Sequence, residues 1–387
     1  MPDSKRQPGA MKWKLIGIGT AIMLAIPGAA VQLDLQSARD ASLARYVPKF
    51  ARSTALEVTA RDQDAGSDKA LAYAESERLL ARRPVPAENL SLYGLLAFET
   101  GKPKQADAAF ALAAQRGWRD TLTQELVINA ALQTQDWQVA ADRLTALWSA
   151  NLDAPNITEV SKAALGVGAV QEAFGARLAH KPRWQSDFLR WAGENLSLES
   201  AANTVHAAIV QRAEFKCNEL AALARNMAFG GQPDAAALAW SGPCRNPKAL
   251  SASDFGFDEP DEGYERGPFE WIYPEFAAFS RTFNSDGKPA VMTVSNSDPE
   301  NRTAAMRLVR LAPGAHSVTV SAQGSAASRV FVRVECIAQD GERGLIARDY
   351  ATAGAIAFEV PAVSCSEQLL TVMVGRGETA AMYLQLS

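Results

Sequence analysis

The chain has 387 residues, a formal net charge of −4, 4 Cys and 3 His. Its length accommodates about two to three domains, and 48% hydrophobic against 21% charged residues is typical of a folded chain. The weak net acidity argues against a nucleic-acid-binding protein, which would carry a basic stripe. The wide separation of His180, His206 and His316 argues against a His-rich metal centre.

Residues 1–35 are predicted to direct export. A basic flank precedes an apolar run over residues 15–31, which is at the short limit for a membrane-spanning helix. The flank should stay in the cytoplasm while the rest of the chain is exported. One interpretation is a cleaved signal peptide, with a helix break at Pro27 and a cut before Val31. The other is an uncleaved anchor in the inner membrane, and a buried N-terminal helix fits the basic flank less well.

The cysteines agree with an oxidising compartment, because all of them lie beyond the apolar run. No Cys-x-x-Cys occurs, which excludes zinc ribbons and thioredoxin-like redox motifs. Of the three possible pairings, placement along the chain favours Cys217–Cys244 and Cys336–Cys365. Each bond would then add about 3–4 kcal/mol in the chain-entropy model. Four buried free thiols are the alternative.

Residues 36–242 are predicted to form a helical domain, because apolar residues recur at three- and four-residue spacing. A two-helix frame is clearest in residues 87–120, recurs 34 residues later, and has an isolated match in residues 216–241. Residues 155–215 are expected to be helical without a regular frame. The residues that we expect to pack these hairpins are Leu90, Tyr93, Gly94, Ala97, Ala106, Phe110, Ala140 and Leu144.

This frame resembles the tetratricopeptide repeat. The resemblance implies that Gly94 and Ala106 lie where two helices touch, with Tyr93 and Phe110 beside them. It departs from the repeat at Leu90, where an aromatic residue is usual, and it lacks the usual closing proline. Repeats of this kind stack into a solenoid that binds other chains, so the resemblance implies a scaffold for envelope proteins. A solenoid that only spaces the next domain from the membrane is the alternative.

The last helical unit supports one of the predicted disulfides. Cys217 precedes a first helix near residues 218–229, and Cys244 follows a second near residues 233–241. Antiparallel helices of a hairpin bring these two ends together. We therefore expect the bond to close the hairpin at its open end.

The C-terminal third changes character at Pro243. Residues 243–268 are predicted to be an acidic linker, since their carboxylates match no calcium-loop spacing. Over residues 269–387 the apolar period becomes two, and turn signals such as Pro313-Gly314 separate the runs. Eight or nine short strands predict an antiparallel β-sandwich of jelly-roll type. The expected fold class is thus multidomain α plus β, an α-solenoid of helical hairpins followed by this sandwich.

The stretch Leu-Ala-Pro-Gly-Ala-His-Ser-Val over residues 311–318 resembles the turn before a core strand in carbohydrate-binding-module-like sandwiches. His316 stands where an aromatic residue is usual. Exported proteins that join an apolar segment, degenerate helical repeats and a terminal sandwich are similar to components of bacterial surface-polysaccharide systems. The resemblance implies a periplasmic protein, tethered to the inner membrane, in exopolysaccharide synthesis or export.

Trp271 and Tyr273 are candidate glycan-stacking residues, because they share one face of a predicted strand and sugar rings stack on exposed aromatic side chains. The alternative is that this face packs the sandwich core, where aromatic residues bury large areas. Both expectations use the same period-two pattern.

The sequence contains no Gly-x-Ser-x-Gly, Walker or His-Glu-x-x-His motif. We therefore assign no catalytic residue, no metal and no cofactor. The favoured interpretation is a non-enzymatic scaffold or assembly factor of the bacterial cell envelope. The alternatives are a glycan-binding protein that uses the sandwich, and a glycan-active enzyme whose site the sequence does not reveal.

Overall fold

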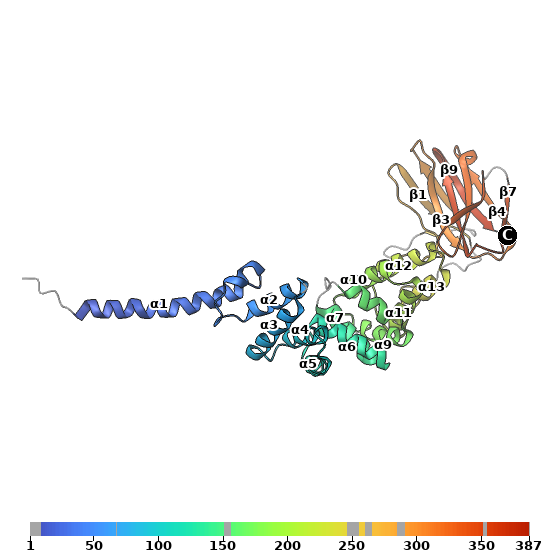
Figure 1. Ribbon diagram of the computed structural model, residues 1–387. Coiled ribbons are helices and arrows are strands. Elements are labelled where there is room, and N and C mark those ends of the chain that lie inside the picture. The colour runs from blue at the N-terminus through green and yellow to red at the C-terminus, as the bar shows by residue number, and fades with distance from the viewer. Residues whose placement is uncertain are drawn as a thin grey trace, which may run out of the picture. The chain divides into compact units, whose positions relative to one another are not determined.

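The computed structural model describes residues 9–66, 68–150, 156–245, 255–259, 265–284, 291–350 and 354–386. Helices are followed by two antiparallel sheets (Figure 1), which confirms the predicted α plus β class. The chain divides into two compact units, residues 1–135 with 146–154, and residues 136–145 with 155–387. The predicted domain boundaries after residues 35, 242 and 268 stay predictions, and much of the predicted linker lies outside the described residues.

The first unit contains a long N-terminal helix, a short 3-10 helix and a series of helices that pair as hairpins. Their bounds are α1 (Gly9–Gln36), η1 (Ala41–Tyr46), α2 (Thr54–Ala65), α3 (Lys69–Arg82), α4 (Ala87–Glu99), α5 (Pro103–Arg116) and α6 (Thr121–Thr134). The helix α7 (Trp137–Ala150) contributes residues to both units.

The helix α1 continues through Pro27, so the helix break expected there is wrong. Proline removes one backbone donor and crowds the preceding turn. The 28-residue helix nevertheless continues, because the remaining turns on both sides of Pro27 stay helical. The side chains of residues 9–22 lie outside the described part. Within the described part, no helix has both the length and the apolar character that crossing a bilayer requires.

The hairpin α4/α5 owes its close packing to small residues. A Cβ added to Gly94 would lie 2.5 Å from Cε1 of Phe110, so the ring occupies the space that glycine leaves. Ala97 and Ala106 are fully buried at the same contact, and the Tyr93 ring lies 5.4 Å from that of Tyr73 on the preceding helix. The structure also buries the remaining packing candidates, which are Leu90, Ala140 and Leu144.

The second unit continues with helices α8 (Ile157–Leu165), α9 (Gly168–Leu178), α10 (Gln185–Asn195), α11 (Leu198–Val210), α12 (Cys217–Phe229) and α13 (Pro233–Ala239). The helices α9 and α11 touch through backbone, since a Cβ at Gly175 would lie 2.7 Å from the Ala208 nitrogen. The disulfide Cys217–Cys244 closes the α12/α13 hairpin with its Cα atoms 5.3 Å apart, as predicted.

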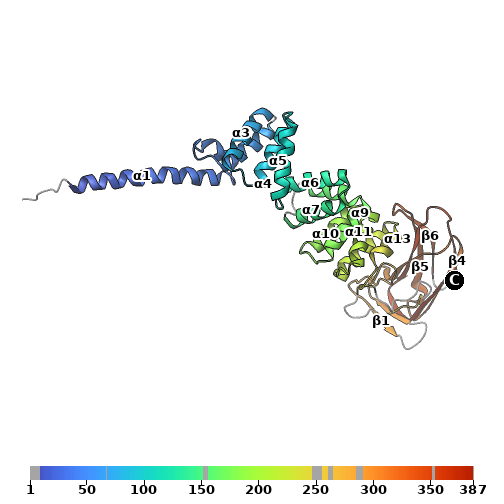
Figure 2. The same ribbon diagram turned by 90° about the horizontal axis from the view of Figure 1, so that it is seen from below.

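Nine strands within the described residues form the sandwich of the second unit (orange to red in Figure 2). One sheet has the order β1-β2-β9-β4-β7 and the other β3-β8-β5-β6. The strand bounds are β1 (Phe279–Asn284), β2 (Val291–Asn296), β3 (Arg302–Val309), β4 (Gly314–Gln323), β5 (Val330–Ile337), β6 (Arg343–Tyr350), β7 (Ala355–Val360), β8 (Glu367–Val374) and β9 (Gly377–Leu386).

The predicted alternation explains how the sheets face each other. Val330, Val332 and Val334 are all buried in the core between the sheets, and Val332 pairs with Val372 of β8. The strand β4 begins at Gly314, whose φ of +129° suits glycine and places the turn directly after Pro313. Apolar residues at every second position therefore build the core from both sheets.

Within the second unit, the α12–α13 turn packs on the β5–β6 turn. A Cβ at Gly231 would lie 1.9 Å from the carbonyl oxygen of Ala338, so glycine is required for this approach. Asp234 at the start of α13 accepts from Arg310 at 3.0 Å. These contacts join the last helical hairpin to one end of the sandwich.

Candidate functional site

A groove between α10 and α12 is the candidate site, and it has a volume of about 320 Å³. Its floor consists of Leu189 and Leu223, which are 2% and 5% exposed and belong to the helical core. Gly193 keeps the groove open, because a Cβ there would already lie 3.0 Å from Cδ1 of Leu223. Ala222 is small and exposed along the same wall.

The rim of the groove is polar and weakly acidic. Arg190 pairs with Asp187 one turn earlier on α10, and Glu219 accepts from Lys216 at 3.0 Å. The carboxylate of Glu194 also lines the rim. Exposed ion pairs of this kind contribute about 0–1 kcal/mol each, so they leave the rim charges available to a ligand.

This groove suits binding better than chemistry. An apolar floor with a charged rim is the usual layout of a small protein–protein contact, in which a partner side chain fills the depression. Among the residues that line it there is no Ser–His or Cys–His pair. In the described part of the chain, no cluster of His, Cys, Asp or Glu has the size needed to hold a metal ion.

Trp271 does not offer a stacking surface. It is 1% exposed, its ring packs 4.9 Å from that of Phe257, and its indole nitrogen donates to the carbonyl of Gly256 at 3.0 Å. A sugar ring cannot reach a side chain enclosed in this way, so the alternative expectation of a core aromatic describes Trp271. The strand predicted here is wrong, since Trp271 and Tyr273 flank Ile272, whose bridge to Met306 is isolated. The segment 255–257 packs against the Trp271 ring, and periodicity alone does not predict that contact.

Tyr273 is half-buried and is held by its hydroxyl group. The hydroxyl donates to the carbonyl oxygen of Asp258 at 2.9 Å. Burial, followed by the nearby Asp258 carboxylate, raises the pKa of Tyr273 above its ordinary value. Its ring also packs edge-on against Phe283, with 4.9 Å between ring centroids. These contacts hold the Tyr273 side chain at the start of the sandwich. Its glycan-stacking role stays a prediction.

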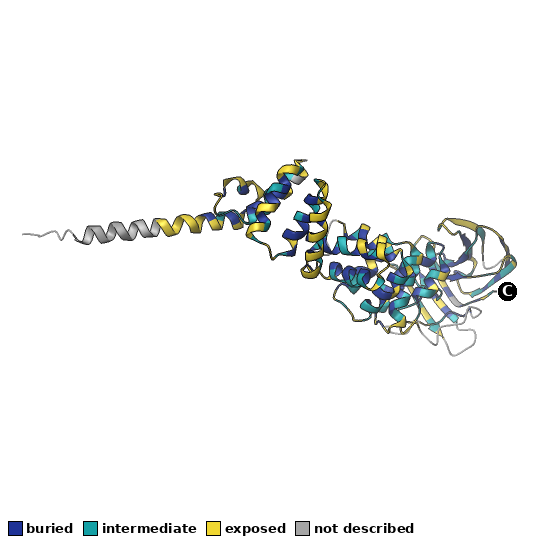
Figure 3. Cartoon of the chain, turned by 60° about the horizontal axis from the view of Figure 1, so that its bottom comes forward, coloured by how far each residue is buried: buried dark blue, intermediate teal, exposed yellow. Residues whose placement is uncertain are grey.

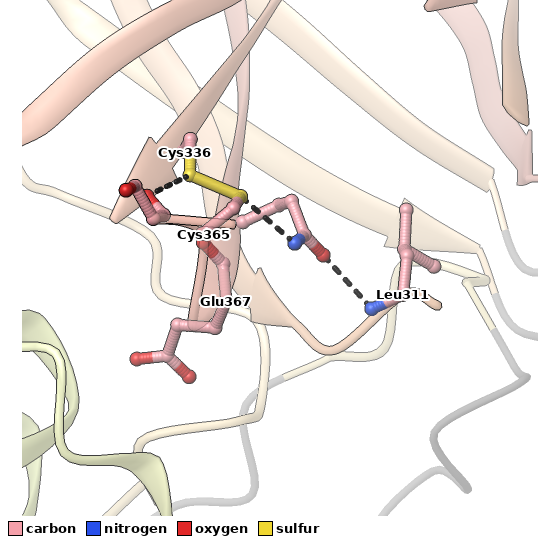
Figure 4. The surroundings of a disulfide bond; sticks show 6 residues. Leu311, Cys336, Cys365 and Glu367 are labelled. Atoms are coloured by element: carbon pink, nitrogen blue, oxygen red, sulfur yellow. Dashed lines mark hydrogen bonds between the residues drawn. A yellow bond between two sulfur atoms is a disulfide. The ribbon is translucent and has the colours of Figure 1, made fainter. Parts of the chain in front are cut away.

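The second disulfide joins Cys336 at the end of β5 to Cys365 before β8, as predicted (Figure 4). Gln368 donates from Nε2 to Cys365 Sγ at 3.3 Å and accepts the Leu311 N–H at 2.8 Å. The amide of Gln368 thus connects the disulfide to the turn before β4. This buried polar contact follows from the pairing of the strands, which sequence reasoning did not supply.

Glu367, next to this disulfide, is a buried carboxylate that the sequence pattern does not predict. It is fully buried, and within the described residues neither carboxylate oxygen has a hydrogen-bond partner (Figure 4). Burial raises the pKa of Glu367 to about 8, with Arg310 opposing the shift and Asp234 adding to it. The only signal is a charged residue at the start of a largely apolar strand.

No protein-family model matches the chain, and no curated protein matches it. One similar solved structure is the Glycosylation Associate Protein (Gap123) complex from Streptococcus agalactiae, with 19% identity, a TM-score of 0.25, and 30% of this chain and 43% of that chain covered. Another is accessory secretory protein 1,2 and 3 in Streptococcus pneumoniae, with 6% identity, a TM-score of 0.24, and 29% and 85% covered. This chain thus spans less than half of the first structure's chain. A structural likeness at this level does not indicate a shared fold or a shared function.

Proposed function

We propose that the chain is a non-enzymatic scaffold or assembly factor of the bacterial cell envelope, and that it holds a partner protein in the groove between α10 and α12. Surface-polysaccharide synthesis or export is the setting we favour. The apolar floor formed by Leu189 and Leu223 is the observation that carries this proposal. The two disulfides indicate an oxidising compartment, which we take to be the periplasm.

The chemistry of the groove describes the segment that it would bind. Burying one leucine-sized side chain contributes about 1.5–3 kcal/mol, and the floor is apolar enough to receive it. Glu194 and Glu219 on the rim favour a Lys or Arg next to that side chain. We therefore expect the partner to present an apolar residue beside a basic one.

A photo-crosslinking residue at position 222 tests the groove directly. Ala222 is exposed and lines the groove, whereas Ala237 is exposed on α13 and does not line it. We expect a discrete adduct with one envelope protein from position 222, mapped by mass spectrometry to an apolar-basic segment, and none from position 237. The same adducts from both positions, or none from position 222, would overturn the proposal.

The substitution Ala222→Arg provides the matching loss of function. The long side chain fills the groove without entering the core, because Ala222 is exposed. We expect the variant to keep the unfolding midpoint of the parent and to bind the crosslinked partner at least tenfold more weakly. Ala237→Arg adds the same charge outside the groove and should bind like the parent.

A periplasmic location has its own test. A reporter that is active only in the periplasm, fused after Ser387, should be active. Activity of a cytoplasmic reporter at the same position would contradict the location and the envelope setting together. That result would not decide whether the groove binds a partner, which the crosslinking tests separately.

A further inference from the structure

A basic cavity of about 370 Å³ lies in the first unit, where Lys49, Arg52 and Arg82 surround it together with Glu75 and Arg78. We propose that this cavity binds the phosphate headgroup of an anionic phospholipid at a bilayer surface. The proposal is independent of the groove between α10 and α12.

Three positive charges at this cavity lack a carboxylate partner in the contacts that the structure shows. Arg52 donates from Nε to the Val47 carbonyl at 2.8 Å, and Arg82 donates to the Lys49 carbonyl at 2.8 Å. Carbonyl oxygens orient a guanidinium group without cancelling its charge, and Lys49 itself is exposed. In a chain of net charge −4, this cluster is therefore a local site for an anion.

Glu75 adds a second requirement for the ligand. Its Oε1 accepts from Arg78 at 2.5 Å, so this pair is neutral as a whole. Its Oε2 is buried and has no hydrogen-bond partner within the described residues, although Glu75 is only 7% exposed. A buried acceptor without a donor is costly. A headgroup that carries a hydroxyl beside its phosphate would supply that donor.

The surroundings of the cavity favour a lipid over a dissolved anion. Tyr46 and Phe50 lie on either side of Lys49 in the chain and are 62% and 65% exposed. Farther toward the N-terminus of α1, Met23 and Leu24 are 78% and 72% exposed, and the described part of this helix is largely exposed (Figure 3). Aromatic, basic and apolar side chains together are typical of a protein surface at the lipid–water interface.

The cavity and α1 are held in one body. The carboxylate of Asp34, near the end of α1, accepts the N–H groups of Ser53, Thr54 and Ala55, each at 2.9 Å. Burial raises the pKa of Asp34, but these backbone donors outweigh it and keep the pKa below its ordinary value. These bonds hold the C-terminal end of α1 against the segment that follows Arg52 of the cavity.

Vesicle flotation of the full chain tests this proposal. We expect vesicles that contain phosphatidylglycerol in phosphatidylcholine to bind the chain more tightly than vesicles of phosphatidylcholine alone. The difference should shrink as salt is raised, because salt screens exposed charges. Any contribution of α1 that does not depend on charge is common to both vesicles and to every variant.

Matched variants locate the binding. Lys49→Glu changes the charge by two units, and about fivefold in affinity per charge predicts about a 25-fold loss on anionic vesicles. Lys104→Glu makes the same change at an exposed position of α5 away from the cavity lining, and should cost less than twofold. Phe50→Ser should also weaken binding, whereas Phe98→Ser, at a side chain that is 66% exposed, should not.

Three results would overturn the proposal. Equal binding to both kinds of vesicle would assign the contact to apolar side chains alone. Equal losses from Lys49→Glu and Lys104→Glu would assign it to net charge. Binding of soluble glycerol phosphate or of an acidic polysaccharide at the cavity, without preference for anionic vesicles, would identify a dissolved anion or a glycan as the ligand.

Discussion

Glu367 is a residue whose ionisation opposes folding. Its carboxylate is fully buried without hydrogen bonds in the described residues, and its pKa is raised from 4.5 to about 8. Between these two values the folded chain holds a proton that the unfolded chain has released. The stabilisation of the fold by this bound proton is present in full below pH 4.5 and is lost as the pH rises toward 8.

We therefore expect Glu367→Gln to flatten the pH dependence of stability. In the parent, this carboxyl lowers the free energy of unfolding by up to about 1.4 kcal/mol per pH unit across that window. Urea unfolding at pH 5, 6, 7 and 8 should show a smaller decline for Glu367→Gln. Glu359→Gln removes an exposed carboxylate on β7 and should decline like the parent. Parallel slopes for all three proteins would contradict the assigned burial.

Trp271 shows the limit of sequence reasoning at the residue scale. The period-two pattern predicts a strand around Trp271, whereas this segment is irregular apart from the bridge between Ile272 and Met306. A core aromatic and a stacking aromatic also share that pattern. The difference depends on Phe257 and Gly256, which contact Trp271 from an irregular segment. The cysteine pairs were predictable, because hairpin ends and neighbouring strands bring such residues together. Glu367 was not predictable, since only the folded neighbours determine its burial.

Helical contacts in this chain differ in what the small residues touch. Gly175 of α9 faces backbone atoms of Ala207 and Ala208 on α11, which cannot move without shifting a helix. Gly94 of α4 faces only the ring of Phe110, which is half-buried. Two glycines at helix contacts are therefore expected to tolerate an added methyl group to different extents.

We expect Gly175→Ala to be the more destabilising of the two substitutions. Overpacking costs about 1–3 kcal/mol, and the better helix propensity of alanine returns up to about 1 kcal/mol. The net cost should be about 1–2 kcal/mol for Gly175→Ala and near zero for Gly94→Ala, measured by urea unfolding. Gly168→Ala, on α9 with open space around its Cβ, is the control and should not destabilise the chain. A larger cost at Gly94 would show that the Phe110 ring is fixed.

At the scale of helices and strands, local sequence signals predict where a helix forms better than where it is interrupted. The frame of residues 87–120 depends on small residues and a Gly-Lys-Pro turn, and α4 and α5 follow it. The residues 155–215 lack that frame, yet α8 to α11 form there because their apolar faces find partners. Pro27 is the opposite case, since the local signal predicts a break and the helix continues through it.

The order of the strands could not be predicted at the scale of the whole molecule. Alternation identifies β4 and β9 as strands, but not that β9 lies between β2 and β4. That placement pairs Met292 with Met382 and Val320 with Leu384, which are distant in the chain. Such pairs are selected by the packing of the common core, and no local period contains that information.

The two disulfides act on different parts of the second unit. Cys217–Cys244 spans 27 residues around the α12/α13 hairpin, and Cys336–Cys365 spans 29 residues of the sandwich. Loops of this length contribute about 3–4 kcal/mol each by restricting the unfolded chain. The helix α13 has only seven residues, which is too short to be stable without such support.

Removing both sulfur atoms of the first bond should therefore loosen α13 selectively. We expect Cys217→Ser/Cys244→Ser to speed amide hydrogen exchange in α13 and to lower the stability of the hairpin by about 3 kcal/mol. Cys336→Ser/Cys365→Ser is the matched control, and it should speed exchange at the ends of β5 and β8 while α13 exchanges as in the parent. Peptide mapping of the unreduced parent, purified from its own compartment, should recover both links. Crossed pairs would contradict the pairing. Free thiols would contradict the oxidising compartment as well, because neither bond persists where thiols are kept reduced.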